Sequence, residues 1–302
     1  MEDIELLKLP LAFQNGSARL LTGDLVVRDI ERWCDRKADK GGVKPVMAVV
    51  YFNTGADAID YVKIKAHVAA RAGVSYWVYE MPVDASTTQV MTQVKKLNKN
   101  PRIHGILIQR PLPRQLNEPE VMRSINPIKN IEEYAKGRAN NIAADALVRL
   151  LTKYGLRESA QQARIQIVGF GNIITKEFIK QMKSQFPYME VEAPRDSIII
   201  SELHRGPGFI KSSMVKSEVS VLVDLGFYVT EKGVLGDVSH VLFDRSSLAI
   251  APTPGGVLPI LLWIMMERTI KAKNLTMKEE MQGCYCMAII ERRSMYPGTT
   301  SA

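Results

Sequence analysis

The sequence predicts an α/β protein in which two α/β domains flank a cleft, the second of them built on a Rossmann-like parallel sheet. Three observations predict this fold class. Short apolar runs alternate with helical stretches between residues 46 and 109, a second alternation begins near residue 165, and 302 residues suffice for two modest domains. The order strand–helix–strand indicates parallel strands joined by right-handed crossovers.

The first part of the chain supplies the elements of the first domain. The run Val46–Phe52 is apolar and β-branched, as in a buried parallel strand. Gly73 suits the end of a helix that begins at Ala56. The remaining periodicity predicts a helical opening segment marked by Leu20, Leu21, Leu25, Val26 and Ile30, a helix over 56–72, a strand over 74–79, a helix over 87–98 and a strand over 103–109.

The second part of the chain repeats the alternation. We expect a helix over 143–154, a strand over 165–168, a helix over 174–184, strands near 189–192, 197–200, 219–224 and 248–250, and a last helix that ends near Lys271. The last 30 or so residues have weak periodicity, so a loosely packed or disordered extension is expected there. The predicted domains are residues 1–140, completed by a returning helix over 257–272, then 141–256, with 273–302 as the extension.

Composition excludes several classes of protein. The net charge of +8 is spread along the chain without a basic block, so no nucleic-acid partner is expected. The three cysteines, Cys34, Cys284 and Cys286, are too few and too badly spaced for a disulfide framework or a zinc site. The start is acidic, unlike a signal peptide, and the longest apolar run is too short for a membrane span. A soluble, cytoplasmic protein without a metal site is the expectation.

Two positions in the first domain are candidates for chemistry. Tyr61 and Lys65 are four residues apart on one face of a predicted helix, so their side chains reach the same space. The alternative is a tyrosine packed on the sheet beside a surface lysine, and Lys63 points to solvent in either case. Gln109 ends a predicted strand, where ligands of open α/β sheets bind. The alternative for Gln109 is an amide that only caps the backbone.

Two glycine-containing loops are further candidates. Gly169-Phe-Gly171 lies between a predicted strand and a helix, as in a dinucleotide-binding turn, but Ile174 stands at the third glycine position. Glu190 and Glu192 follow about 20 residues later, where an acid would hold a ribose hydroxyl, unless they are solvated strand-end charges. The second loop lets the backbone approach a flat ligand closely, and its sequence is Pro252-Thr-Pro254-Gly255-Gly256-Val.

Taken together, these motifs resemble the bifunctional methylenetetrahydrofolate dehydrogenase/methenyltetrahydrofolate cyclohydrolase family over residues 5 to 272. The resemblance rests on ordered matches: Tyr61-Val-Lys-Ile-Lys65, Gly105-Ile-Leu-Ile-Gln109-Arg-Pro-Leu, Ile125-Asn-Pro-Ile-Lys129-Asn-Ile-Glu132, Gly206-Pro-Gly-Phe, Val223-Asp224-Leu-Gly226, Gly236-Asp237-Val238 and Pro252-Thr-Pro-Gly-Gly-Val. It implies a hydride transfer from the folate to NADP or NAD, followed by hydrolysis of the methenyl cation that results.

The resemblance also implies roles for particular residues. Lys65 would move protons, Gln109 would orient its amine, and Tyr61 would stack on the pterin. Substrate would bind at Glu132, Pro254, Gly255 and Gly256, and the cofactor at Gly169, Gly171, Asn172 and Ile173. The partners implied are a folate substrate and a second copy of the chain, or an intact paralogue.

Several positions depart from the family pattern. Glu132 replaces an aspartate, Gly171 a phosphate-binding serine, and Thr175 a close-approach glycine, while two interior segments are shortened. The departures affect the residues expected to bind the cofactor more than they affect Lys65 and Gln109. Three hypotheses follow: a working family enzyme with cyclohydrolase activity better supported than dehydrogenase, a pseudoenzyme that serves as a subunit or scaffold, and a nicotinamide-dependent dehydrogenase with another substrate.

Overall fold

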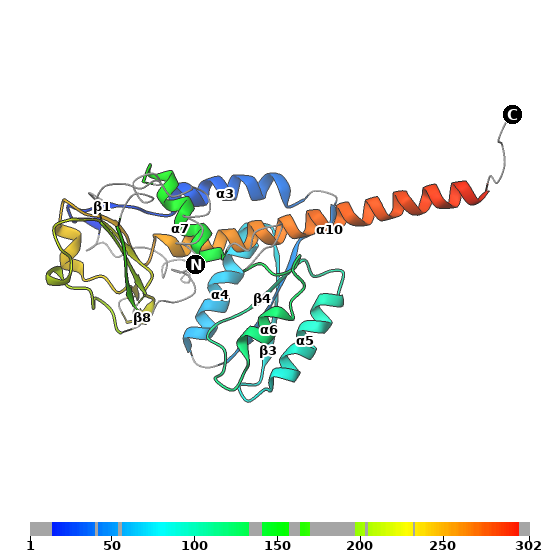
Figure 1. Cartoon of the computed structure of the whole chain (residues 1–302), viewed down its shortest axis with the longest axis horizontal. Helices are drawn as coiled ribbons and strands as arrows, with labels where there is room; N and C mark the ends of the chain where they lie inside the picture. Colours follow the sequence, from blue (N-terminus) through cyan, green and yellow to red (C-terminus); the bar gives the residue numbers. More distant parts are fainter. Residues whose placement is uncertain are drawn as a thin grey trace.

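The computed structural model describes residues 14–39, 42–53, 56–132, 141–156, 164–169, 197–202, 205–231 and 233–295. Two α/β units, each built on a parallel sheet, lie at opposite ends of the body, and one long helix runs past both (Figure 1). The predicted fold class is therefore confirmed. The helix predicted over 174–184, the strand near 189–192 and the two glutamates Glu190 and Glu192 lie outside the described residues.

The first sheet has the order β3–β2–β4, with β2 (Val46–Phe52) between β3 (Ser75–Met81) and β4 (Gly105–Ile108). All pairings are parallel. Every residue of β2 is buried, which explains its continuous apolar run. Three helices belong to this unit: α4 (Ala56–Arg71), α5 (Thr87–Lys99) and α6 (Glu118–Arg123). The strands and helices predicted here are confirmed, with ends that differ by up to two residues.

The second sheet has the order β1–β10–β7–β6–β5, and all of its strands are parallel. Its strands are β1 (Arg19–Leu20), β5 (Arg164–Gly169), β6 (Ser197–Glu202), β7 (Val219–Asp224) and β10 (Ala249–Ala251). A two-stranded antiparallel hairpin joins β8 (Tyr228–Thr230) to β9 (Gly233–Leu235), and two short 3₁₀ turns cover Ser212–Met214 and His240–Asp244.

The opening segment differs from its prediction. Leu20 is not helical, because it pairs with Ile250 as part of β1. The helix α3 (Asp24–Lys37) begins only after Gly23, and it buries Val26, Ile30 and Cys34 on one face. The apolar residues before Gly23 are explained by burial in the second sheet, a tertiary contact that helical spacing cannot reveal.

The C-terminal helix α10 (Val257–Met295) differs from its prediction more than the opening segment does. The predicted end near Lys271 is wrong, because the chain stays helical up to Met295; of the expected loosely packed or disordered extension, only the disorder is contradicted up to that residue. No proline occurs between Pro259 and Pro297, so nothing interrupts the backbone hydrogen bonds of the helix. Its first half packs against α3 and α7 (Ile142–Lys153), and its second half extends away from the body (Figure 1).

Lys273 ties α10 to the first unit. Its side chain is fully buried, and its Nζ donates to the carbonyl oxygens of Ala38 at 2.7 Å and Val43 at 3.0 Å. Burial lowers the pKa of Lys273. These bonds hold the segment after α3 on the last helix, which explains why the helix does not end at Lys271.

We expect Lys273→Met to lower the free energy of unfolding by about 2 kcal/mol, because it leaves the buried Ala38 carbonyl and the partly buried Val43 carbonyl without this donor. Urea denaturation measures the loss. Lys44→Met is the matched control, since Lys44 is exposed and its loss is expected to stay within about 0.5 kcal/mol. Equal stability of the two variants would contradict this role of Lys273.

Candidate active site

Lys65 and Gln109 form a buried pair at the carboxyl edge of the first sheet. Lys65 lies on α4 with 3% of its surface exposed, and its Nζ donates to Gln109 Oε1 at 2.9 Å. Gln109 follows β4 directly, and its backbone N–H still donates to Val50 of β2 at 2.8 Å. The strand therefore fixes the glutamine, and the glutamine fixes the lysine amine. Lys63, two residues away, is exposed as predicted.

Tyr61 completes the group from the preceding turn of α4. The Lys65 Nζ lies over the Tyr61 ring, 4.5 Å from its centroid. The same ring makes a T-shaped contact with Phe227 of the second unit, with centroids 5.0 Å apart and planes at 85°. The structure thus brings Tyr61, Lys65 and Gln109 together at a contact between the two units. Because Lys65 is buried, the alternative interpretation of a surface lysine beside a packed tyrosine does not apply.

The surroundings of Lys65 favour a neutral amine. Burial lowers the pKa of Lys65 to about 7, and the negative charge of Glu132 partly opposes this shift. Glu132 is itself paired, because its Oε2 lies 2.5 Å from Arg110 Nη1. Arg110 also binds Glu118 at 2.6 Å. An amine with a pKa near neutrality can gain or lose a proton under physiological conditions, as a general base must.

The Pro-Gly-Gly loop lies between β10 and α10, and contacts within the protein explain its glycines. The Gly255 carbonyl accepts from Gly23 N–H at 2.7 Å, with Gly255 at φ +99°. A Cβ on Gly256 would lie 2.6 Å from the Pro252 oxygen. The predicted reason for these glycines was close approach to a ligand, and the structure adds a packing reason that is independent of any ligand.

A buried carboxylate cluster holds the segment that carries Phe227. Asp224 ends β7 and accepts three backbone N–H groups at 2.9 Å, from Gly226, Asp237 and Val238. Burial raises the pKa of Asp224 to about 7. Its main-chain oxygen also accepts the Thr253 hydroxyl at 2.8 Å, which ties the Pro-Gly-Gly loop to the same segment.

Asp237 is the second carboxylate of this cluster. It accepts hydroxyl groups from Ser201 at 2.6 Å and from Tyr228 at 2.7 Å. In the sequence, Asp224 and Asp237 stand out only as parts of family motifs, and no role is predicted for either. Each of the two motifs has an aspartate close to a glycine, which is the signal in the sequence. In the structure each glycine leaves room for the aspartate of the other motif, because a Cβ on Gly226 would meet Asp237 and a Cβ on Gly236 would meet Asp224.

The residues predicted to bind the cofactor are only partly described. Gly169 ends β5 at the carboxyl edge of the second sheet, beside β6. Gly171, Asn172 and Ile173 lie outside the described residues. Within the described part of the chain, no group of histidine, cysteine, aspartate or glutamate side chains could hold a metal ion.

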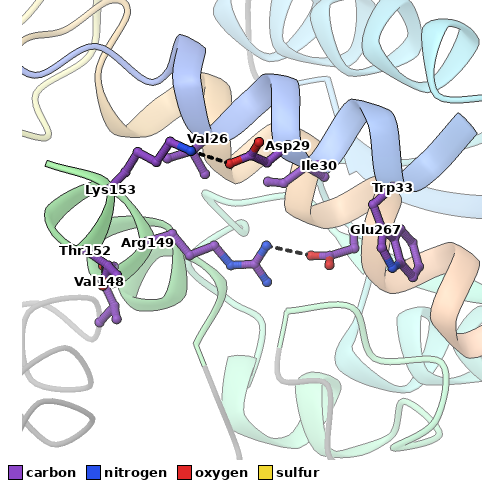
Figure 2. Close-up of a pocket in the computed structure, with 9 residues that line it drawn as sticks. All are labelled: Val26, Asp29, Ile30, Trp33, Val148, Arg149, Thr152, Lys153 and Glu267. Carbon is purple, nitrogen blue, oxygen red and sulfur yellow. Dashed lines mark hydrogen bonds and ion pairs between the residues drawn. The ribbon is translucent and has the colours of Figure 1, made fainter.

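A pocket of about 640 Å³ lies elsewhere, between α3, α7 and α10 (Figure 2). Ion pairs cross it, from Lys153 to Asp29 at 2.6 Å and from Arg149 to Glu267 at 2.8 Å. It contains none of the predicted site residues. Its lining consists of Val26, Asp29, Ile30, Trp33, Val148, Arg149, Thr152, Lys153 and Glu267.

The fold and the site together define a protein of two α/β domains. The second domain is built on a parallel sheet of the dinucleotide-binding type, and a buried lysine–glutamine pair lies beside the contact between the two domains. Residues 21–132 match the family model described as "Tetrahydrofolate dehydrogenase/cyclohydrolase, catalytic domain", and residues 141–277 match its "NAD(P)-binding domain". The chain belongs to the tetrahydrofolate dehydrogenase/cyclohydrolase family.

Relatives of known name agree with this assignment. The chain is 29% identical over 251 residues to the "Bifunctional protein FolD" of Wolinella succinogenes, covering 76% of this chain and 87% of that protein. It is 26% identical to the protein of the same name from Thermodesulfovibrio yellowstonii, covering 86% and 98%.

Solved structures share the fold. The bifunctional enzyme FolD from Campylobacter jejuni superposes with a TM-score of 0.71 at 21% identity, over 85% of this chain and 99% of that one. The Trypanosoma brucei FolD structure, complexed with NADP cofactor and inhibitor, gives 0.72 at 19% identity, over 86% and 98%. Separately, none of the helices that the structure describes is long and apolar enough to cross a membrane.

Proposed function

We propose that the chain hydrolyses methenyltetrahydrofolate and oxidises methylenetetrahydrofolate with a nicotinamide cofactor, as a bifunctional enzyme of one-carbon metabolism. The observation that carries this proposal is the buried Lys65–Gln109 pair, whose amine has a pKa near neutrality and lies against Tyr61. We assign folate binding to residues 1–140 with the returning helix over 257–272, and cofactor binding to residues 141–256.

In the hydrolysis, Lys65 acts as the general base. A water molecule attacks the methenyl carbon of the cationic substrate, and the neutral amine takes a proton from that water as the carbon–oxygen bond forms. The adduct then opens as one carbon–nitrogen bond breaks and its hydroxyl becomes the formyl carbonyl. The hydroxyl loses a proton and the nitrogen that leaves takes one up, so the net proton released is the one that Lys65 accepted. Gln109 Oε1 holds an N–H of Lys65 at 2.9 Å, which orients the amine for this transfer.

The substrate is bound by groups around this pair. We assign stacking on the pterin to Tyr61, hydrogen bonding of the pterin to Glu132, and main-chain contacts to Pro254, Gly255 and Gly256. The pairing of Glu132 with Arg110 holds its carboxylate in place before substrate arrives. The positive charge of the substrate further favours the neutral form of Lys65.

The described residues fit a dinucleotide at the end of β5. Gly169 lies at the carboxyl edge of a parallel sheet, the edge at which such sheets bind ligands. Gly169, Gly171, Asn172 and Ile173 would hold the pyrophosphate, and the bound nicotinamide would accept hydride from the methylene carbon. The substitution at Gly171 does not favour NADP over NAD or NAD over NADP, so the affinity for each cofactor is compared by titration.

The rate of hydrolysis is expected to depend on pH through Lys65. The groups that face it are the Tyr61 ring, Gln109 and the Glu132 charge. Because the base must be neutral, kcat/KM is expected to rise with pH, with an inflection near 7, and to level above it. The test measures kcat/KM from about pH 6 to about pH 9 and subtracts the uncatalysed rate. A flat profile would contradict Lys65 as the base.

The proposed assembly rests on the resemblance, and the proposed location rests on the small number of cysteines. We propose a cytoplasmic homodimer; β3 forms one edge of the first sheet, and Val78 on it is 43% exposed. Light scattering of the purified chain measures its mass. A monomer that binds folate without turning it over would instead favour the pseudoenzyme, which would pair with an intact paralogue.

A further inference from the structure

Arg268 of α10 reaches across to the segment that carries Glu132. Its side chain is buried, and its Nη1 donates to two successive carbonyl oxygens, those of Ile131 and Glu132, each at 2.9 Å. Its Nη2 donates to Asp145 Oδ2 at 3.2 Å. A guanidinium group suits this task because it offers several donors in a fixed plane.

A charge network on α7 and α10 extends from Arg268, and Asp145 is the member that binds its guanidinium directly. Asp145 also binds Arg149, through Nε at 3.0 Å and Nη2 at 3.2 Å. Arg149 continues to Glu267 at 2.8 Å (Figure 2), and Glu267 binds Lys271 at 2.8 Å. Alternating charges of this kind compensate a buried guanidinium, which would otherwise be costly to remove from water.

The Glu132 main chain is fixed by these contacts. Its N–H donates to Asn130 Oδ1 at 3.1 Å, and its carbonyl accepts Ile142 N–H at 3.1 Å as well as Arg268. Its side chain meets Arg110, the residue directly after Gln109. The place of the Glu132 carboxylate beside the Lys65–Gln109 pair therefore depends on a main chain that Arg268 holds.

We propose that Arg268 is a positioning residue that sets Glu132 for binding of the folate pterin. This inference rests on the proposed function, and it assigns to the C-terminal helix a part in substrate binding. Arg268 does not touch the substrate; it acts through the carbonyl groups of Ile131 and Glu132. Its loss should weaken substrate binding and leave the proton transfer at Lys65 largely unchanged.

The test compares Arg268→Met with Arg149→Met in hydrolysis of methenyltetrahydrofolate. Arg268→Met is expected to raise KM about tenfold and to change kcat by less than about twofold. The substitution removes hydrogen bonds that position Glu132 for substrate binding, and it leaves the groups that transfer the proton in place. Arg149→Met breaks the same network at Asp145 and Glu267 but touches neither carbonyl, so its KM should stay at the wild-type value. Arg268→Lys keeps the charge and one or more donors, so its KM should fall between the two, and it serves if the methionine variant does not fold.

Hydrogen exchange of the Glu132 and Ile142 amides gives a second readout that needs no activity. Faster exchange in the Arg268 variants than in Arg149→Met is expected. An unchanged KM in the Arg268 variants, or equal changes in KM and exchange for both positions, would overturn the positioning role. A wild-type chain that neither hydrolyses the substrate nor binds a folate analogue would instead overturn the proposed function, and the exchange rates would still decide whether Arg268 holds the Glu132 segment.

Discussion

Lys65→Met is expected to reduce the hydrolysis of methenyltetrahydrofolate by at least about 100-fold, to a rate close to the uncatalysed background. Methionine fills a similar volume but has no proton to exchange, so the Lys65–Gln109 hydrogen bond and the base are lost together. Decay of the substrate absorbance measures the rate. Lys63→Met is the matched control on the same helix, because Lys63 is exposed and should retain wild-type activity.

The same substitution is expected to stabilise the protein. Because the folded-state pKa of Lys65 is about 7, below its ordinary value of 10.5, the cost of burying its charge is fully present below pH 7. That cost is relieved as pH rises from about 7 to 10.5, so wild-type stability rises across this range. Lys65→Met removes the cost and should raise Tm most at low pH. An active variant, or one that loses both activity and stability, would contradict this account of Lys65.

Gly236→Ala is expected to lower the free energy of unfolding by about 3 kcal/mol. A Cβ at this position would overlap with the buried Asp224 carboxylate, which cannot move without losing three backbone hydrogen bonds. Because Asp224 anchors the segment that carries Phe227, displacement should also loosen the Phe227–Tyr61 contact. Activity measured on the folded fraction is therefore expected to fall as well.

Gly233→Ala is the matched control for Gly236→Ala. Gly233 lies in the same hairpin region at φ +98°, and a Cβ there would meet nothing within 4 Å. Its cost is that of backbone strain alone, about 1 kcal/mol. Urea denaturation of both variants separates the two effects. If Gly236→Ala loses no more stability than Gly233→Ala, the close fit of Asp224 against Gly236 does not matter for the fold.

The sequence predicts the alternating core well. Val46–Phe52 is buried along its whole length, and continuous burial is what produces a continuous apolar run. The meeting of Lys65 with Gln109 also follows from topology, because α4 leaves β2 at the edge where the neighbouring strand β4 ends. Two successive β-α-β crossovers, β2–α4–β3 and β3–α5–β4, therefore bring residues 44 positions apart to one place.

The rest depends on contacts that no local pattern encodes. Arg268 and Glu132 are 136 positions apart, and a charged residue on a helix reads as a solvated one until its partners are known. Phe227 meets Tyr61 only because the two units pack together. The continuation of α10 past Lys271 likewise depends on Lys273, whose partners Ala38 and Val43 lie near the start of the chain.

The most direct test of the account is the hydrolysis of methenyltetrahydrofolate by the wild-type chain without any nicotinamide cofactor. The Lys65–Gln109 pair is formed by the first unit alone, so the reaction should proceed without NADP or NAD. The expected rate is proportional to protein concentration and saturates with substrate. A rate equal to that of buffer, together with no saturable binding of a folate analogue, would contradict it.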